Sequence, residues 1–180
     1  TQKVLAFYKP VGVTCTERDP HAEKKIMDMI RYPERLTYAG RLDKDSEGLI
    51  LLTNDGDLIN AMMRGGNRHE KEYIVKTDRE ITPDFLEKMA KGIYLKDLDI
   101  TTRECEIEQI GKFTFRIVLT QGVNRQIRRM CEACGYRVKA LKRIRIMNIL
   151  LGDLKPGKWR EVTGEELEQL QRDTGMLNRN

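Results

Sequence analysis

Short apolar runs separated by turn-forming residues predict a mixture of strands and helices. The run from Val4 to Tyr8 ends at Lys9-Pro10-Val11-Gly12, where proline and glycine force a turn. The run from Gly48 to Thr53 is too apolar to alternate, which predicts a strand buried on both faces. From Phe113 to Thr120 apolar and polar residues alternate, which predicts a strand with one buried face.

Three further strands are expected from residue type and turn signals. Tyrosine and valine favour a strand from Glu72 to Lys76. A Gly111-Lys112 turn would pair a strand from Ile100 to Ile110 with the strand that begins at Phe113. The apolar residues between Arg145 and Leu151 indicate another strand.

Helix-capping residues and apolar residues at helical spacing predict five helices. They are a helix from Pro20 to Ile30, one from Leu58 to Met63 before Gly65-Gly66, one capped by Thr82 and closed by Gly92, one capped by Asn124 and closed by Gly135, and one opened by a capping box at Thr163 to Glu166. This mixture favours an α+β fold with a mostly antiparallel or mixed sheet and flanking helices. We expect one domain over residues 1–180, with any boundary between two lobes near residues 65–67 and a frayed tail at residues 173–180.

The composition is typical of a soluble globular protein. Of the 180 residues, 39% are hydrophobic and 34% are charged, which leaves too little apolar sequence for a membrane span. The first ten residues lack the pattern of a signal peptide, so we expect a cytoplasmic location and no membrane partner. The chain has no P-loop, metal-ligand cluster or dinucleotide-binding motif.

The formal net charge of +5 is concentrated in one segment. Between Gln121 and Arg145 the only acid is Glu132, among eight basic residues. The eight are Arg125, Arg128, Arg129, Arg137, Lys139, Lys142, Arg143 and Arg145. Such clustering is typical of a surface that binds a phosphate backbone, although a solvated charged face has the same composition.

The four cysteines (Cys15, Cys105, Cys131 and Cys134) are interpreted as reduced thiols, because no secretory context is visible. Cys131 and Cys134 form a CxxC pair, which elsewhere is half of a zinc site or a redox pair. A second ligand pair at suitable spacing is missing. Together with Ile127 and Met130 they fall at i, i+3, i+4 and i+7, the buried stripe of a helix.

Acidic residues stand directly before the apolar run that begins at Gly48. Asp43, Asp45 and Glu47 have the spacing of the first ligands of a calcium-binding loop. Asn54 occupies the position of the essential bidentate acid, which argues against calcium. A solvated loop is the usual location of such residues. Asp43 differs because its apolar neighbours would hold its carboxylate against apolar surface, where it needs a partner such as an arginine.

Four short motifs are spread along the chain. They are Lys9-Pro10-Val11-Gly12, Gly40-Arg41-Leu42-Asp43 with the run from Gly48 to Gly56, Lys71-Glu72-Tyr73, and Asn124-Arg125-Gln126-Ile127-Arg128-Arg129-Met130. In this order they resemble the signature of RNA pseudouridine synthases, in the RsuA branch that modifies ribosomal RNA. The resemblance covers residues 4 to 167, and residues 119–132 and 145–148 are most similar to a synthase of that branch that acts on 23S ribosomal RNA.

The resemblance implies a pseudouridine synthase catalytic fold and an isomerisation in which uracil is detached from C1′, rotated and rejoined through C5. This reaction needs no metal and no other cofactor, so none is expected. Asp43 would be the catalytic carboxylate, kept ionised by Arg128, and Tyr73 would stack on a uridine flipped out of the RNA. Lys9 and Pro10 would support the catalytic loop. Contacts with RNA are expected from Arg41, Arg125, Arg129, Lys139, Lys142, Arg143 and Arg145.

The expected partner is 23S ribosomal RNA or another structured RNA, with no obligate protein partner. Relatives in this branch carry an N-terminal S4-type RNA-binding domain, and we expect this chain to be the catalytic domain without it. Ser46 stands where the family usually has threonine, which keeps the hydroxyl group. The alternative is an RNA-binding or ribosome-assembly module that uses the same basic face without catalysis.

Overall fold

The computed structural model describes residues 1–15, 26–64 and 68–176. Within these residues a mixed sheet runs through the whole molecule in the order β11-β1-β3-β9-β4-β8-β7, with β2 added to β3 and β10 added to β9. The strands of this sheet are β1 Val4–Lys9, β2 Thr37–Tyr38, β3 Glu47–Thr53, β4 Lys71–Thr77, β7 Glu106–Gly111, β8 Thr114–Leu119, β9 Val138–Ile146, β10 Ile149–Leu150 and β11 Trp159–Glu161. A separate small pair is formed by β5 Tyr94–Leu95 and β6 Ile100–Thr101.

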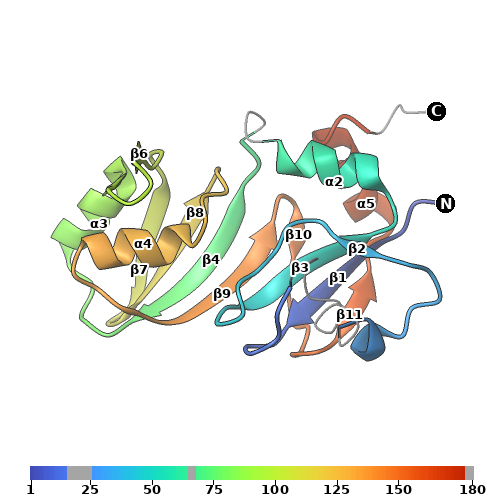
Figure 1. The fold of residues 1–180 in the computed structure, drawn as a ribbon, viewed down its shortest axis with the longest axis horizontal. Helices are drawn as coiled ribbons and strands as arrows, with labels where there is room; N and C mark the ends of the chain where they lie inside the picture. Colours follow the sequence, from blue (N-terminus) through green and yellow to red (C-terminus); the bar gives the residue numbers. More distant parts are fainter. Residues whose placement is uncertain (16–25, 65–67, 177–180) are drawn as a thin grey trace.

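Helices flank both halves of the sheet (Figure 1). The helices are α2 Gly56–Met63, α3 Pro83–Lys91, α4 Gln126–Ala133 and α5 Gly164–Asp173. Figure 1 shows α3 and α4 beside the half formed by β4, β8 and β7, and α2 and α5 beside the other half. The expected α+β class with a mixed, mostly antiparallel sheet and flanking helices is confirmed. None of the helices in the described ranges is long and apolar enough to cross a membrane.

The two halves of the sheet meet where β3 and β9 pair in parallel, with Glu47 beside Lys142 and Gly48 beside Arg143. At this seam the backbones approach so closely that a Cβ atom on Gly48 would lie 2.3 Å from the carbonyl oxygen of Arg143. Gly48 also has a φ of +114°, which side chains disfavour. Glycine at this position therefore allows the β3–β9 seam to form.

Alternating residues of β1 and β3 enter two different hydrophobic clusters, one on each face of the sheet. Leu49 and Leu51 pack into the first cluster, whereas Ile50 and Leu52 pack into the second. All four side chains are fully buried, which confirms the prediction of a strand covered on both faces. In the other half of the sheet, a third cluster lies between β4, β8 and β9 and the helices α3 and α4.

Two predicted strands have the wrong limits. The expected strand from Ile100 to Ile110 is interrupted, because the Thr102 and Cys105 amides donate to the carbonyls of Ile93 and Ala90 and draw this segment toward α3. Only the part from Glu106 onward pairs with β8. The expected strand from Arg145 to Leu151 is instead the end of β9 and its hairpin partner β10, with the chain reversing at Met147, where φ is +54°.

Helix caps were predicted with mixed success. The Thr82 hydroxyl accepts a hydrogen bond from the Phe85 amide at 3.1 Å, as expected of an N-cap. The Asn124 cap is wrong, because Arg125 takes the N-cap position of α4 and the Asn124 side chain accepts from Arg129 at 3.1 Å. The capping box of α5 is also wrong, since the Glu166 carboxylate accepts two hydrogen bonds from Arg160.

The remaining predictions concern segments near the undescribed residues. Residues 26–30 are helical, and the rest of the predicted first helix lies outside the described residues. The predicted lobe boundary at residues 65–67 also lies outside them. In the part of the predicted frayed tail that is described, the amides of Thr174 and Met176 donate to the carbonyls of Leu170 and Gln171.

Candidate active site

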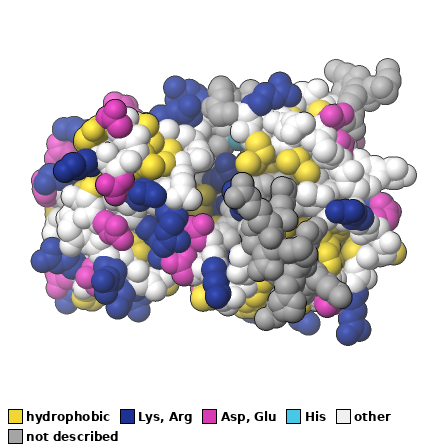
Figure 2. Space-filling model, in the orientation of Figure 1, with side chains coloured by type: hydrophobic (Ala, Val, Ile, Leu, Met, Phe, Trp, Pro, Cys, Tyr) yellow, Lys and Arg dark blue, Asp and Glu magenta, His cyan; other side chains and the backbone are white. Residues whose placement is uncertain are grey.

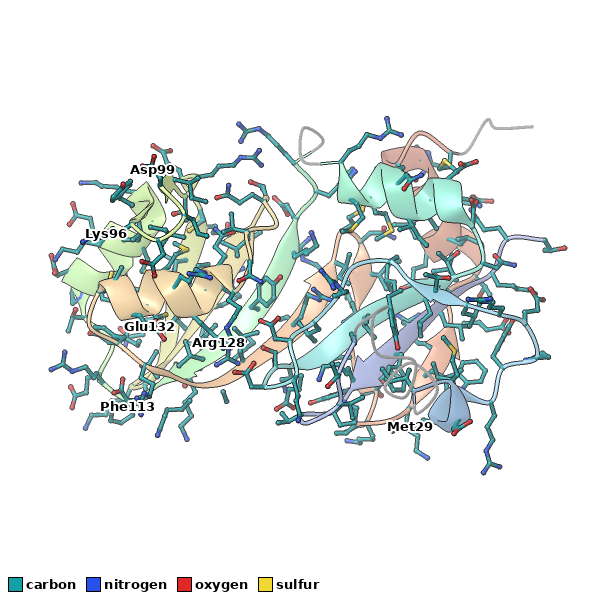
Figure 3. All side chains as sticks on the ribbon, in the orientation of Figure 1. Met29, Lys96, Asp99, Phe113, Arg128 and Glu132 are labelled. Atoms are coloured by element: carbon teal, nitrogen blue, oxygen red, sulfur yellow. The ribbon has the colours of Figure 1, made fainter. Side chains whose placement is uncertain are left out.

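A cavity of about 400 Å³ opens between the loop of residues 40–46, which we call the acidic loop, and the start of α4. Tyr73 and Lys71 from β4 and Arg143 from β9 line it beside Asp43. Figure 3 shows Arg128 projecting from α4 toward the middle of the molecule. Asp43 is the one carboxylate among the described residues that line this cavity.

Two buried cations hold the acidic loop from below. Lys9 is completely buried, and its ammonium group donates to the carbonyls of Pro10 and Val13 at 2.7 Å and to that of Lys44 at 3.5 Å. Arg143, 3% exposed, donates from Nε to the carbonyl of Leu49 at 2.8 Å and from Nη1 to that of Arg41 at 3.3 Å. Both residues thus fix the backbone on either side of Asp43.

Asp43 itself lies partly open to the cavity, with a side chain that is 39% exposed. Its carboxylate forms an ion pair with Arg125, whose Nη1 lies 3.3 Å from Oδ2. The same guanidinium donates two hydrogen bonds, of 3.1 and 2.9 Å, to the carboxylate of Asp45. These bonds hold the pKa of Asp45 below its usual value. Arg125 therefore bridges both acids of the loop.

Arg128 binds the acidic loop at Asp45 and Ser46, on the C-terminal side of Asp43. Its Nη2 donates to the Asp45 carbonyl at 3.0 Å and to the Ser46 hydroxyl at 3.1 Å. The predicted ion pair between Asp43 and Arg128 is therefore wrong, because Arg125 makes that pair and Arg128 is anchored on the loop backbone. The Nε atom of Arg128 is buried without a hydrogen-bond partner in the described part of the chain.

The sequence can be compared with known families. Residues 3–133 match the family model described as RNA pseudouridylate synthase. The chain belongs to this family. Its fold agrees, since it superposes with a TM-score of 0.86 on a structure described as a crystal structure of pseudouridylate synthase, at 28% identity over 94% of this chain and 74% of that chain.

Curated members of the pseudouridylate synthase family are also similar over most of this chain. The dual-specificity RNA pseudouridine synthase RluF of Escherichia coli (strain K12) is 47% identical over 167 residues, 93% of this chain, which confirms the predicted likeness to one synthase of the branch. The ribosomal large subunit pseudouridine synthase B of Vibrio cholerae is 34% identical over 177 residues, also 93% of this chain. The chain spans only 57% and 54% of these two relatives.

In this pseudouridylate synthase fold the predicted RNA-binding residues are dispersed. Arg41 is exposed and lines the cavity, and Arg125 lies at the cavity beside it. Arg129, Lys139 and Lys142 lie outside the cavity lining. Figure 2 shows that basic side chains are spread over this face of the molecule rather than gathered in a single patch.

Two of the predicted RNA-binding residues are not on an open basic surface. Arg143 is buried beneath the acidic loop, so it is not part of an exposed basic surface. Arg145 pairs with Glu72 at 2.7 Å and with Glu70 at 3.0 Å, and its side chain is only 19% exposed. Both lie on β9, of which the sequence pattern predicted only the end, from Arg145 onward.

Lys71 is a cavity residue to which the sequence analysis gave no role. It is the first residue of β4, two positions before Tyr73, and alternation along a strand places both side chains on one face. Burial and the neighbouring Arg143 guanidinium lower the pKa of Lys71. The sequence could have indicated Lys71 as a site residue, because it belongs to the Lys71-Glu72-Tyr73 motif. Side chains on a strand alternate with a period of two, so Lys71 lies on the same face as Tyr73.

Cys15 and Cys131 are buried, whereas Cys105 and Cys134 are only partly buried. Cys131 is completely buried on α4, and burial raises the pKa of its thiol to about 12. Burial also raises the pKa of Cys105, to about 11. Among the described residues, no group of three or more His, Cys, Asp or Glu side chains is arranged to hold a metal ion.

Proposed function

We propose that this chain is the catalytic domain of an RNA pseudouridine synthase, an isomerase that converts a uridine of 23S ribosomal RNA to pseudouridine in the cytoplasm. The observation that supports it best is the position of Asp43. Its carboxylate lines a cavity large enough for a flipped nucleotide base, which the side chain of Tyr73 also lines. The family membership and the similarity to RluF support the same activity.

Asp43 acts as the nucleophile in this proposal. A carboxylate oxygen forms a bond to C1′ of the ribose while the C1′–N1 bond breaks and its electron pair moves onto the uracil ring. After the ring has rotated, C5 forms a bond to C1′ and the bond to Asp43 breaks, which returns the electron pair to the carboxylate. C5 then loses a proton and N1 gains one, so the product is an isomer of the substrate.

The residues around Asp43 have distinct parts in this reaction. The Arg125 guanidinium, 3.3 Å from the carboxylate, favours its ionised form. Tyr73 stacks on the flipped uracil, a contact worth about 1 to 3 kcal/mol. Arg128 fixes the loop through Ser46 and the Asp45 carbonyl. Lys9 and Pro10 position the loop and do not contact the uridine.

RNA is held by the cations around the cavity mouth. Arg41 and Arg125 are exposed there and are suited to phosphate groups next to the flipped nucleotide. Arg129, Lys139 and Lys142 extend the contact surface beyond the mouth. Because RluF is described as a dual-specificity enzyme, a second structured RNA also belongs among the candidate substrates.

The test of this function replaces Asp43 with asparagine, which preserves shape and removes the charge. We expect Asp43→Asn to abolish pseudouridine formation, scored by carbodiimide-dependent primer-extension stops on ribosomal RNA, while RNA affinity changes by less than about threefold. The matched control is Asp153→Asn, an exposed position outside the cavity, which should retain full activity.

Undiminished activity in Asp43→Asn would refute the catalytic role. Absence of activity in the unmodified protein, combined with tight RNA binding, would favour the RNA-binding or assembly module. Mapping of pseudouridines in ribosomal RNA from cells that lack the protein identifies the target nucleotide.

A further inference from the structure

Two cations stand side by side in the wall of the cavity. Arg143 uses Nε and Nη1 to hold the acidic loop, but its Nη2 is buried and has no hydrogen-bond partner in the described part of the protein. Lys71 lines the same cavity and is close enough to Arg143 for their charges to repel. In the described ranges, no carboxylate offsets the positive charge of Lys71.

This arrangement is unfavourable for the free protein. A partly buried ammonium group loses hydration, and a like charge beside it adds repulsion. A buried guanidinium nitrogen without a partner costs further free energy. The cavity carboxylate does not relieve either group, because Asp43 is paired with Arg125. An unpaired cationic pair of this kind suits an anion that is present only when substrate is bound.

The position of the pair indicates which part of an RNA this anion belongs to. Phosphate groups remain on the outside of a nucleic acid, and the exposed Arg41 and Arg125 at the cavity mouth are placed to meet them. Lys71 and Arg143 lie deeper, on the strands that carry Tyr73 and the seam below the acidic loop. A flipped base reaches this depth, whereas the backbone stays at the mouth.

We propose that Lys71, reinforced by the positive charge of the buried Arg143 guanidinium, stabilises the negative charge that develops on the uracil ring when it is detached from the ribose. This inference rests on the proposed function. When the C1′–N1 bond breaks, its electron pair is left on N1 and is shared with the O2 carbonyl oxygen. The two cations stabilise that charge until C5 uses the ring's electrons to form the new bond to C1′, so their contribution is made only to the reacting state.

The test replaces the lysine with an uncharged side chain of similar length, Lys71→Met. Removing one donor to a developing charge is expected to lower the single-turnover rate by about 100-fold or more. Affinity for a stem-loop RNA, measured by filter binding, should change by less than about threefold, since Lys71 does not meet the phosphate backbone. Lys76→Met is the matched control, because Lys76 lies on the same strand, is exposed and is outside the cavity.

A leaving-group measurement separates this role from a purely structural one. Fluorine at C5 makes uracil a better-stabilised anion, so an RNA with 5-fluorouridine at the target depends less on the two cations. The rate loss caused by Lys71→Met should be smaller on this RNA by about tenfold. Because the fluorine blocks loss of the C5 proton, the assay follows disappearance of 5-fluorouridine after nuclease digestion, by mass spectrometry.

Stability gives a second, independent outcome. Since the folded state lowers the pKa of Lys71, the charged lysine disfavours folding, and its removal should raise the melting temperature by about a few degrees. A lower melting temperature or an unfolded variant would mean that the lysine is structural, which overturns the inference. Equal rate losses on both RNAs, or lost affinity at an unchanged rate, would also overturn it. If the unmodified protein forms no pseudouridine, the proposed function itself fails instead.

Discussion

The β3–β9 seam makes Gly48→Ala the most informative test of the fold around the cavity. Alanine at a φ of +114° would be strained by about 1 to 3 kcal/mol. Its Cβ atom would lie 2.3 Å from the Arg143 carbonyl oxygen and 2.8 Å from the Arg143 nitrogen, and both are backbone atoms that cannot rotate away. The seam must therefore open, with a loss of ladder hydrogen bonds worth about 0.5 to 1.5 kcal/mol each.

With two such hydrogen bonds lost, the summed cost is about 2 to 6 kcal/mol, a large part of the roughly 5 to 15 kcal/mol by which domains are stable. For a domain of this size that corresponds to a fall in melting temperature of about 10 °C. Urea denaturation followed by circular dichroism measures the change. The control is Gly56→Ala at the start of α2, where a Cβ atom meets nothing within 4 Å and should change stability by less than about 1 kcal/mol. A Gly48→Ala protein as stable as this control would refute the close approach of the two strands.

Two other predictions concern α4 and the buried thiols. Arg128→Ala should lower the single-turnover rate by about 100-fold through misplacement of the acidic loop, with RNA affinity nearly unchanged. Equal losses of rate and RNA affinity, with an affinity that depends less steeply on salt concentration, would identify Arg128 as a phosphate contact instead. Cys131 and Cys105, with pKa values raised to about 12 and about 11, should react with a thiol reagent at pH 8 over hours when native and within minutes when unfolded. Peptide mass spectrometry assigns the labelled cysteines, and equal rates in the two states would contradict their burial.

Strands with apolar sequences were predictable, whereas the strand beneath the cavity was not. β3 and β8 show a continuous or alternating apolar pattern because packing alone determines their residues. Four of the nine residues of β9 are Lys or Arg, namely Lys139, Lys142, Arg143 and Arg145. These charges hide the alternation of apolar and polar residues that would indicate a strand. They are present because Arg143 supports the acidic loop and Arg145 binds Glu70 and Glu72. Departures from local pattern are expected where a strand serves a site.

The candidate site was predictable in its residues but not in their partners. The motifs indicated Asp43, Tyr73 and the basic helix, and the structure brings all three to one cavity. Which arginine reaches Asp43 depends on the backbone of Arg125, whose φ of +50° turns it back over the acidic loop. Nothing in the neighbouring sequence signals this conformation, because non-glycine residues with positive φ are uncommon.

The double attachment of Arg143 also limits how related sequences can vary in length. Side chains on a strand alternate, so an insertion or deletion of one residue within β9 before Arg143 would turn its guanidinium to the opposite face. The carbonyls of Leu49 and Arg41 would then lose their donor. The turn at Gly135 can absorb a change in length, whereas the span from Ala140 to Arg143, which pairs with β4 without a register shift, cannot. Alignments of homologous chains should therefore place their gaps before this strand and leave its spacing to the β3–β9 seam constant.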